Sequence, residues 1–193
     1  MNSTASKATS LQSTIENLVQ KYQIQINIKQ IVQADDVVVI NGCLILKQEE
    51  YSQTFRDRKD ITSVIAPFLK KVQFDMFFQA SNLKTVIMPA VEEIQKGSTK
   101  ISAFMGTQVE NCYFPELITV GAFAFQGCKI KILDEDNFPS LELVWKAAFM
   151  GCPIETLNLP YLKQVGDFGF SGIQATQINL PQLISVGKNG FYN

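Results

Sequence analysis

Six of the seven prolines in the chain recur at nearly constant spacing, and this regularity restricts the possible folds more than any other feature. Successive members lie 22, 26, 24, 21 and 21 residues apart. The ladder consists of Pro67, Pro89, Pro115, Pro139, Pro160 and Pro181. Self-similarity at a period of about 20–29 residues indicates stacked repeat units. A single unit of this size cannot bury its apolar side chains alone, so neighbouring units must bury them together.

The residues around each proline repeat as well. An aliphatic residue follows each proline after two positions, and another follows after five. A phenylalanine then begins the next unit; this column is Phe78, Phe104, Phe125, Phe149, Phe170 and Phe191. Before Pro160, Leu157 and Leu159 alternate with polar residues, which predicts a short strand that the proline ends. The pattern therefore predicts a β-rich solenoid with short parallel strands.

The combined pattern F-x-G-C-x-x-x-x-L-x-L-P-x-L-x-x-V-G-x-x-x-F resembles the BspA-type, or Treponema pallidum-type, leucine-rich repeats. The resemblance covers residues 61–193 in about six units. Insertions around residues 93–100 and 133–137 depart from it, as does Trp145, which stands where other units have a turn glycine. The resemblance implies a curved leucine-rich-repeat solenoid that binds proteins. The family occurs in bacteria and in large numbers in parasitic protists, so a protist source is expected.

The first third of the chain lacks the repeat. Residues 1–9 are small and polar and predict a disordered tail. An apolar stripe from Leu11 to Tyr22 predicts a helix with Ser10 as its N-cap. Ile24, Ile26 and Ile28 alternate with polar residues, as in a strand or an exposed edge. The sequence VVVI-Asn41-Gly42-CLIL predicts a hairpin with a type I′ turn. We expect residues 10–60 to form an N-terminal cap of a helix plus a hairpin on the solenoid of residues 61–193.

Composition excludes several functions. The net charge is −1, so no basic surplus favours nucleic acid as the partner. Histidine is absent, which removes histidine-based catalysis and imidazole metal ligands. The acidic run Asp134-Glu135-Asp136 lacks the spacing of a calcium loop and is better explained as a solvated insertion. We therefore expect no metal, no cofactor and no enzymatic activity.

The four cysteines leave alternatives open. Cys128 and Cys152 occupy equivalent positions, in FQGC and FMGC. Equivalent positions of adjacent coils lie about 5 Å apart, so a disulfide is geometrically conceivable. A buried and reduced pair of small side chains that fill the turn is the expected state, with a reactive thiol as the remaining alternative. Cys43 and Cys112 are interpreted as packing residues.

The chain contains no apolar run near the roughly 18 residues of a transmembrane helix, so no membrane span is expected. No secretory signal peptide is recognised, which favours a cytoplasmic location, or the cell surface if the chain is a fragment of a longer protein. The last residues, Phe191-Tyr192-Asn193, lie where another repeat would start. End-to-end self-association, or a structural or adhesin-like role as part of a larger assembly, is therefore the alternative to a protein-binding module.

The binding surface is expected on the strands, at the residue two positions before each ladder proline. This column should face outward, opposite the buried pair. It comprises Ile65, Ile87, Tyr113, Asn137, Asn158 and Asn179. A second outward column lies four residues before each proline and includes Glu135. Exposed tyrosine and isoleucine with a polar rim favour a protein ligand. Two structural alternatives remain: Ile65 and Ile87 pack under the cap, and the asparagines hydrogen-bond to one another along the stack.

Overall fold

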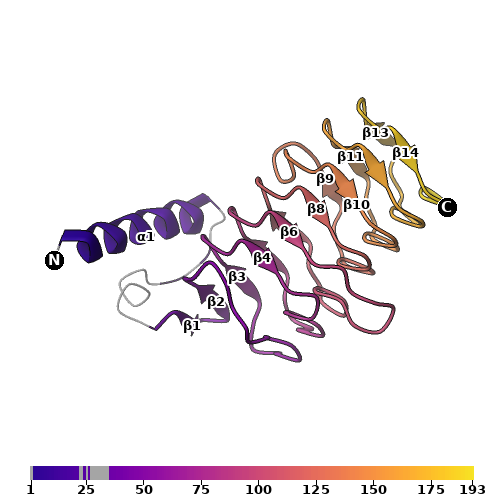
Figure 1. Ribbon diagram of the computed structural model, residues 1–193. Coiled ribbons are helices and arrows are strands. Elements are labelled where there is room, and N and C mark those ends of the chain that lie inside the picture. The colour runs from indigo at the N-terminus through magenta and orange to yellow at the C-terminus, as the bar shows by residue number, and fades with distance from the viewer. Residues whose placement is uncertain (1, 22–23, 25, 27–34) are drawn as a thin grey trace.

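The computed structural model describes residues 2–21, 24, 26 and 35–193 (Figure 1). One helix, α1 (Asn2–Lys21), is followed by a β-solenoid of about seven coils. The helix begins before the predicted N-cap Ser10 and includes residues 2–9, for which a disordered tail was expected. These residues contain two alanines and no glycine or proline, so nothing in them terminates a helix. No described helix is long and apolar enough to cross a membrane.

The predicted hairpin is confirmed. Strands β1 (Val37–Ile40) and β2 (Cys43–Leu46) pair antiparallel, with Ile40 opposite Cys43. The turn residues Asn41 and Gly42 have φ angles of 50° and 77°, as a type I′ turn requires at both central positions. The strand expected around Ile24, Ile26 and Ile28 is not formed at Ile24 and Ile26, and Ile28 lies outside the described residues.

Each coil contributes two short strands, which form two sides of the solenoid. The first side has two sheets: one joins β1 and β2 to β3, β5 and β7, and the other joins β9, β11 and β13. Their bounds are β3 (Ser63–Ile65), β5 (Thr85–Ile87), β7 (Asn111–Tyr113), β9 (Ile132–Leu133), β11 (Thr156–Asn158) and β13 (Gln177–Asn179). Apart from the β1–β2 hairpin, every pair on this side is parallel. This confirms the predicted solenoid of short parallel strands.

The second side is one continuous parallel sheet of six two-residue strands. They are β4 (Lys71–Val72), β6 (Glu93–Ile94), β8 (Thr119–Val120), β10 (Leu143–Val144), β12 (Gln164–Val165) and β14 (Ser185–Val186). In each pair, equivalent residues of neighbouring repeats stand opposite one another, such as Val144 and Val165. The apolar residue five positions after each ladder proline thus forms a column along the stack.

A column of stacked phenylalanine rings fills the interior. Neighbouring rings from Phe77 to Phe191 have centroids 4.7–5.5 Å apart and are nearly parallel. The sequence assignment was wrong at its first member, since the ring that stacks on Phe104 belongs to Phe77 and not to Phe78. Phe78 instead lies under the guanidinium group of Arg56, whose carbon is 5.2 Å from the ring centroid. Phe77 lies ten residues after Pro67, the same distance as in the last four units, so the assignment was one residue out of register where two phenylalanines are adjacent.

The stack also begins one coil earlier than the repeat pattern indicated. Phe55 stacks on Phe77 at 6.0 Å, and its amide donates to the carbonyl of Met76. Strand β2 pairs in parallel with β3, as the later strands pair with each other. Residues 43–60 therefore form the first coil, although the sequence analysis placed them in the cap. In the structure the solenoid therefore begins before residue 61, which the sequence analysis gave as its first residue.

Turn chemistry explains the glycine in the F-x-G part of the repeat. Gly127 and Gly151 both have a φ of 73°, a left-handed conformation that costs glycine little. In two earlier coils, Asp57 and Gln79 hold the same conformation at the same distance after the phenylalanine. The amide of Gly127 donates to the carbonyl of Met150, so this turn also bonds to the next coil.

The core assignment generates a stability test at two adjacent residues, the last residue of β11 and the one that follows it. Leu159 is fully buried, whereas the Asn158 side chain points away from the interior. Leu159→Ala should lower the free energy of unfolding by about 2–5 kcal/mol, because it leaves a cavity in the stack. Asn158→Ala is the matched control and should cost well under half as much. Chemical denaturation of both variants measures this, and a larger loss for Asn158→Ala would contradict the register.

Candidate binding surface

Helix α1 covers the beginning of the first side (Figure 1). Ile15 and Leu18 on the helix pack against Ile45, Ile65 and Ile87 on the strands, in a cluster separate from the solenoid interior. All three isoleucines have no exposed surface. The residues thus face outward from the coil as predicted, but a second apolar layer covers them.

This packing changes the status of the first two candidate binding residues. Ile65 and Ile87 were candidates for contact with a partner, and the helix occupies their surface. The structure therefore corresponds to the alternative in which they pack under the N-terminal segment. Tyr113, one coil further along, is only partly buried, and the ammonium group of Lys21 lies 4.2 Å from its ring centroid. Tyr113 consequently marks the boundary between the covered and the open part of the first side.

The three asparagines of the predicted column do not form one continuous row. The side-chain amide of Asn179 donates to Asn158 Oδ1 at 2.8 Å, so these two residues bond along the stack. Asn137 is held within its own loop, since its Oδ1 accepts from the amide of Asp134 and its Nδ2 donates to the carbonyl of Ile132. The asparagine-ladder alternative is therefore correct for one step of the stack.

A three-residue insertion explains this difference. Ile132 and Leu133 pair in register with Thr156 and Leu157, so the strand precedes the insertion. The Phe114 amide then donates to the Asn137 carbonyl, as the Met88 amide donates to the Tyr113 carbonyl one coil earlier. Residues 134–136 thus bulge out between two regular positions. Asn137 keeps its place in its column, but the outward position assigned to Glu135 belongs to Ile132.

The bulge opens the hydrogen-bond ladder between β7 and β9. These strands lie in different sheets, and across this step the described residues show no backbone bond from Lys131 or Ile132 to Glu110. Equivalent bonds exist on the coils before and after, for example from Asn111 to Lys84 and from Thr156 to Lys131. The coils stay joined at both ends of the gap, by Phe114 to Asn137 and by Lys129 to Val109. The seam is therefore a local opening in a continuous stack.

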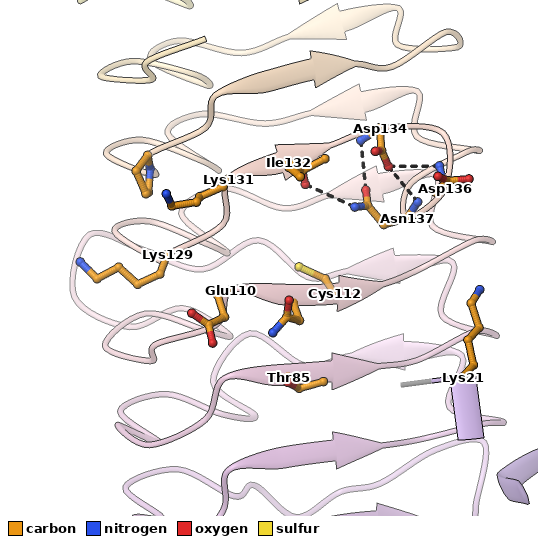
Figure 2. A pocket seen from close by; sticks show the side chains of 12 residues that line it. Lys21, Thr85, Glu110, Cys112, Lys129, Lys131, Ile132, Asp134, Asp136 and Asn137 are labelled. Atoms are coloured by element: carbon orange, nitrogen blue, oxygen red, sulfur yellow. Dashed lines mark hydrogen bonds between the residues drawn. The ribbon is translucent and has the colours of Figure 1, made fainter. Parts of the chain in front are cut away.

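A hollow of about 1080 Å³ lies over this seam. Figure 2 shows Lys129, Lys131 and Glu110 where the strands begin, and Lys21 with the 134–137 loop where they end. Between them lie the outward side chains of the two strands. The hollow is also lined by Thr85, Asn111, Cys112, Ile132 and Pro153.

The charges around the hollow are balanced. Lys131 forms an ion pair with Glu155 at 2.8 Å, and this hydrogen bond raises the pKa of the lysine. Asp134 Oδ1 accepts the amides of Asp136 and Asn137, which orders the loop. Among the described residues no cluster of acidic residues and cysteines is suited to hold a metal ion. The surface thus offers hydrogen bonds and compensated charges around the half-exposed side chain of Ile132.

Sequence analysis found only part of this surface. It identified Tyr113 and Asn137, and its second outward column contained Thr85 and Asn111, but it missed Lys21, Glu110, Lys129 and Lys131. The position of Lys21 depends on where α1 docks, which the repeat pattern does not contain. The insertion around residues 133–137 was visible in the proline spacing. It was the one feature of the sequence that indicated an interruption of the hydrogen-bond ladder between β7 and β9.

The cysteines have the properties of packing residues. All four are free thiols, and burial raises the pKa of Cys128 to about 12 and of Cys43 to about 11. Burial also raises the pKa of Cys112 and Cys152. The thiol of Cys152 donates to the Phe125 carbonyl at 3.0 Å, which holds the protonated form in place. These groups are poor nucleophiles at neutral pH, because the thiolate is the reactive species.

Residues 98–193 match the family described as BspA type Leucine rich repeat region, in six copies. The matched segment begins within the third coil and includes the seam and the hollow. No curated protein and no solved structure matches the chain.

The thiol states can be measured directly. In the folded protein at pH 8, alkylation of Cys43, Cys128 and Cys152 should be at least tenfold slower than in the unfolded chain, because their thiolates are suppressed and the residues are buried. Under denaturing conditions without reductant, all four cysteines should react. Intact mass after labelling counts the modified thiols. Labelling of only two cysteines in the unfolded, unreduced sample would reveal a disulfide and contradict this assignment.

Proposed function

Because residues 98–193 belong to the BspA-type leucine-rich repeats, we propose that this chain is a protein-interaction module without catalytic activity. Solenoids of this family are typically non-catalytic. The proposed contact surface is the part of the first side that α1 leaves open, centred on the hollow between β7 and β9. The partner is a protein, and neither nucleic acid nor a cofactor takes part.

The packing of α1 is the observation that supports this proposal most strongly. The covered half of the first side buries the apolar face of a helical segment through Ile15 and Leu18. The same row of outward positions continues into the open half as Tyr113 and its neighbours. A surface that already binds one segment of polypeptide in this chain is suited to bind another beside it.

The open half has the composition of a protein-binding patch. Ile132 is 49% exposed beside the hollow, with Tyr113 on the preceding coil. Charged and amide side chains line the hollow around Ile132, including Glu110, Lys129 and Asn137. An apolar centre with a polar rim is the usual arrangement at protein interfaces.

Within this surface, the proposed contacts are Tyr113, Asn137, Asn158 and Asn179, together with Ile132. Tyrosine is among the residues that most often dominate binding energy. The bonded pair of Asn158 and Asn179 presents a pre-ordered polar edge that loses little conformational freedom on binding. Ile65 and Ile87 hold α1 in place and so act on this surface indirectly.

A structural role in a larger assembly is the second candidate. It is supported by the last coil, where Ile178, Ile184 and Val186 are 54%, 78% and 47% exposed. Such a coil can stack on another coil, whether from a second copy or from a longer chain.

The proposal can be tested with two isoleucines of nearly equal exposure on different sides. Ile132 lines the hollow at 49% exposure, and Ile118 beside β8 on the second side is 46% exposed. Ile132→Asn should weaken capture of the protein partner from source-cell lysate by about tenfold, because an apolar contact near the centre of the interface is lost. Quantitative mass spectrometry of captured proteins provides the measurement.

Ile118→Asn is the matched control and should leave capture of the partner within about twofold of the unchanged chain. Both variants should have melting temperatures within about 2 °C of that of the unchanged chain, as expected for surface substitutions. If both variants lose capture equally, the proposal that the partner binds the first side would be contradicted. A selective loss of thermal stability in Ile132→Asn would show that the residue acts in folding instead.

A further inference from the structure

Trp145 is the one tryptophan of the chain, and its side chain is 49% exposed on the second side of the solenoid. It follows strand β10 in the column that continues as Gly166 and Gly187 on later coils. The ladder of backbone bonds fixes this equivalence, since the amides of Gln95, Gly121, Trp145 and Gly166 each donate to the coil before. A large aromatic residue thus stands where the neighbouring coils carry glycine.

Gly121 is the preceding member of this column, and the backbone of the coil before approaches it closely. A Cβ on Gly121 would lie less than 3.0 Å from backbone atoms of Gln95 and Lys96, so no side chain can stand at this position. The bare backbone of Gly121 therefore lines the surface beside the Trp145 ring.

A hollow of about 360 Å³ occupies this place, at the lower end of the range found for small-ligand sites. Its polar lining comes from Glu93, Gln95, Lys96 and Thr119, with Trp145 as the aromatic wall. Glu93 and Thr119 stand opposite each other on β6 and β8. Lys96 lies in the predicted insertion around residues 93–100, so the hollow lies where the repeat departs from its pattern twice.

The charges of the lining favour a neutral ligand. Glu93 already forms an ion pair with Lys71 at 2.7 Å, so its charge is compensated without a ligand. A cationic ligand would also approach Lys96, and an anionic ligand would approach Glu93. The remaining groups are an amide and a hydroxyl, which both donate and accept hydrogen bonds. An aromatic wall with such groups matches a sugar ring, which has an apolar face of C–H groups and a rim of hydroxyls.

We propose that this hollow binds one neutral hexose unit of an oligosaccharide, stacked on Trp145, with hydroxyls bound by Gln95 and Thr119. This site lies on the second side, so it is independent of the proposed protein-binding surface on the first side.

The single tryptophan makes the test specific, because the intrinsic emission of the chain reports on this site alone. The probes are four neutral trisaccharides: cellotriose, laminaritriose, maltotriose and N,N′,N″-triacetylchitotriose. At least one should shift the tryptophan emission in a saturable manner, and saturation-transfer NMR should show contact through the C–H face of a sugar ring.

Trp145→Gly restores the residue that the neighbouring coils carry and should fold normally, as circular dichroism can verify. It should weaken trisaccharide binding measured by NMR at least tenfold. Tyr161→Ala is the control, because Tyr161 is a comparably exposed aromatic residue outside the hollow; it should leave binding unchanged. The proposal would be overturned if none of the four trisaccharides changed the tryptophan emission or gave an NMR contact, or if Trp145→Gly bound them as well as the unchanged chain does. Saturable emission change with an arginine-rich peptide and none with the saccharides would also overturn it, in favour of a cation site.

Discussion

The structure depends on the stacking of each coil on the next, and the phenylalanine column shows this dependence most clearly. Phe77, Phe104, Phe125, Phe149 and Phe170 have no exposed surface, and each ring stacks on its neighbours. A coil of about 21 residues has two very short strands and cannot bury such a ring alone. The backbone ladders and the aromatic column therefore form together, and the inward residues are fixed by stacking. Function must use the outward positions and the places where the repeat is interrupted.

Two interruptions shape the surface. The three inserted residues 134–136 open the ladder between β7 and β9, and the opened step holds the hollow on the first side. On the second side, Trp145 replaces a glycine and stands beside the bare backbone of Gly121. In both cases the regular stack supplies a rigid frame, and one irregular unit supplies a shape that the other units lack. Helix α1 adds a third element, because it covers the apolar part of the first side and leaves the polar part open.

The proline spacing was sufficient to predict the solenoid, the parallel strands and five of the six phenylalanines. Periodicity determines which positions point inward, so these predictions follow from one pattern. The prediction failed at Phe78, where an adjacent phenylalanine occupies the column, and at Glu135, where an insertion lies between the strand and the proline. Counting from a single reference residue cannot locate an insertion within a unit. The N-terminal segment carried no repeat, so its sequence could not show that Phe55 begins the aromatic stack or that α1 covers Ile65 and Ile87.

The adjacent phenylalanines provide the most direct measurement of this account. Phe77 lies in the stack between Phe55 and Phe104, whereas Phe78 lies outside it under Arg56. Phe77→Ala should lower the free energy of unfolding by about 3–5 kcal/mol, because it empties the centre of the core. Phe78→Ala should cost less than half of that amount in the same denaturant titration. A loss for Phe78→Ala that equals or exceeds the loss for Phe77→Ala would contradict the stacked column on which the fold is argued to depend.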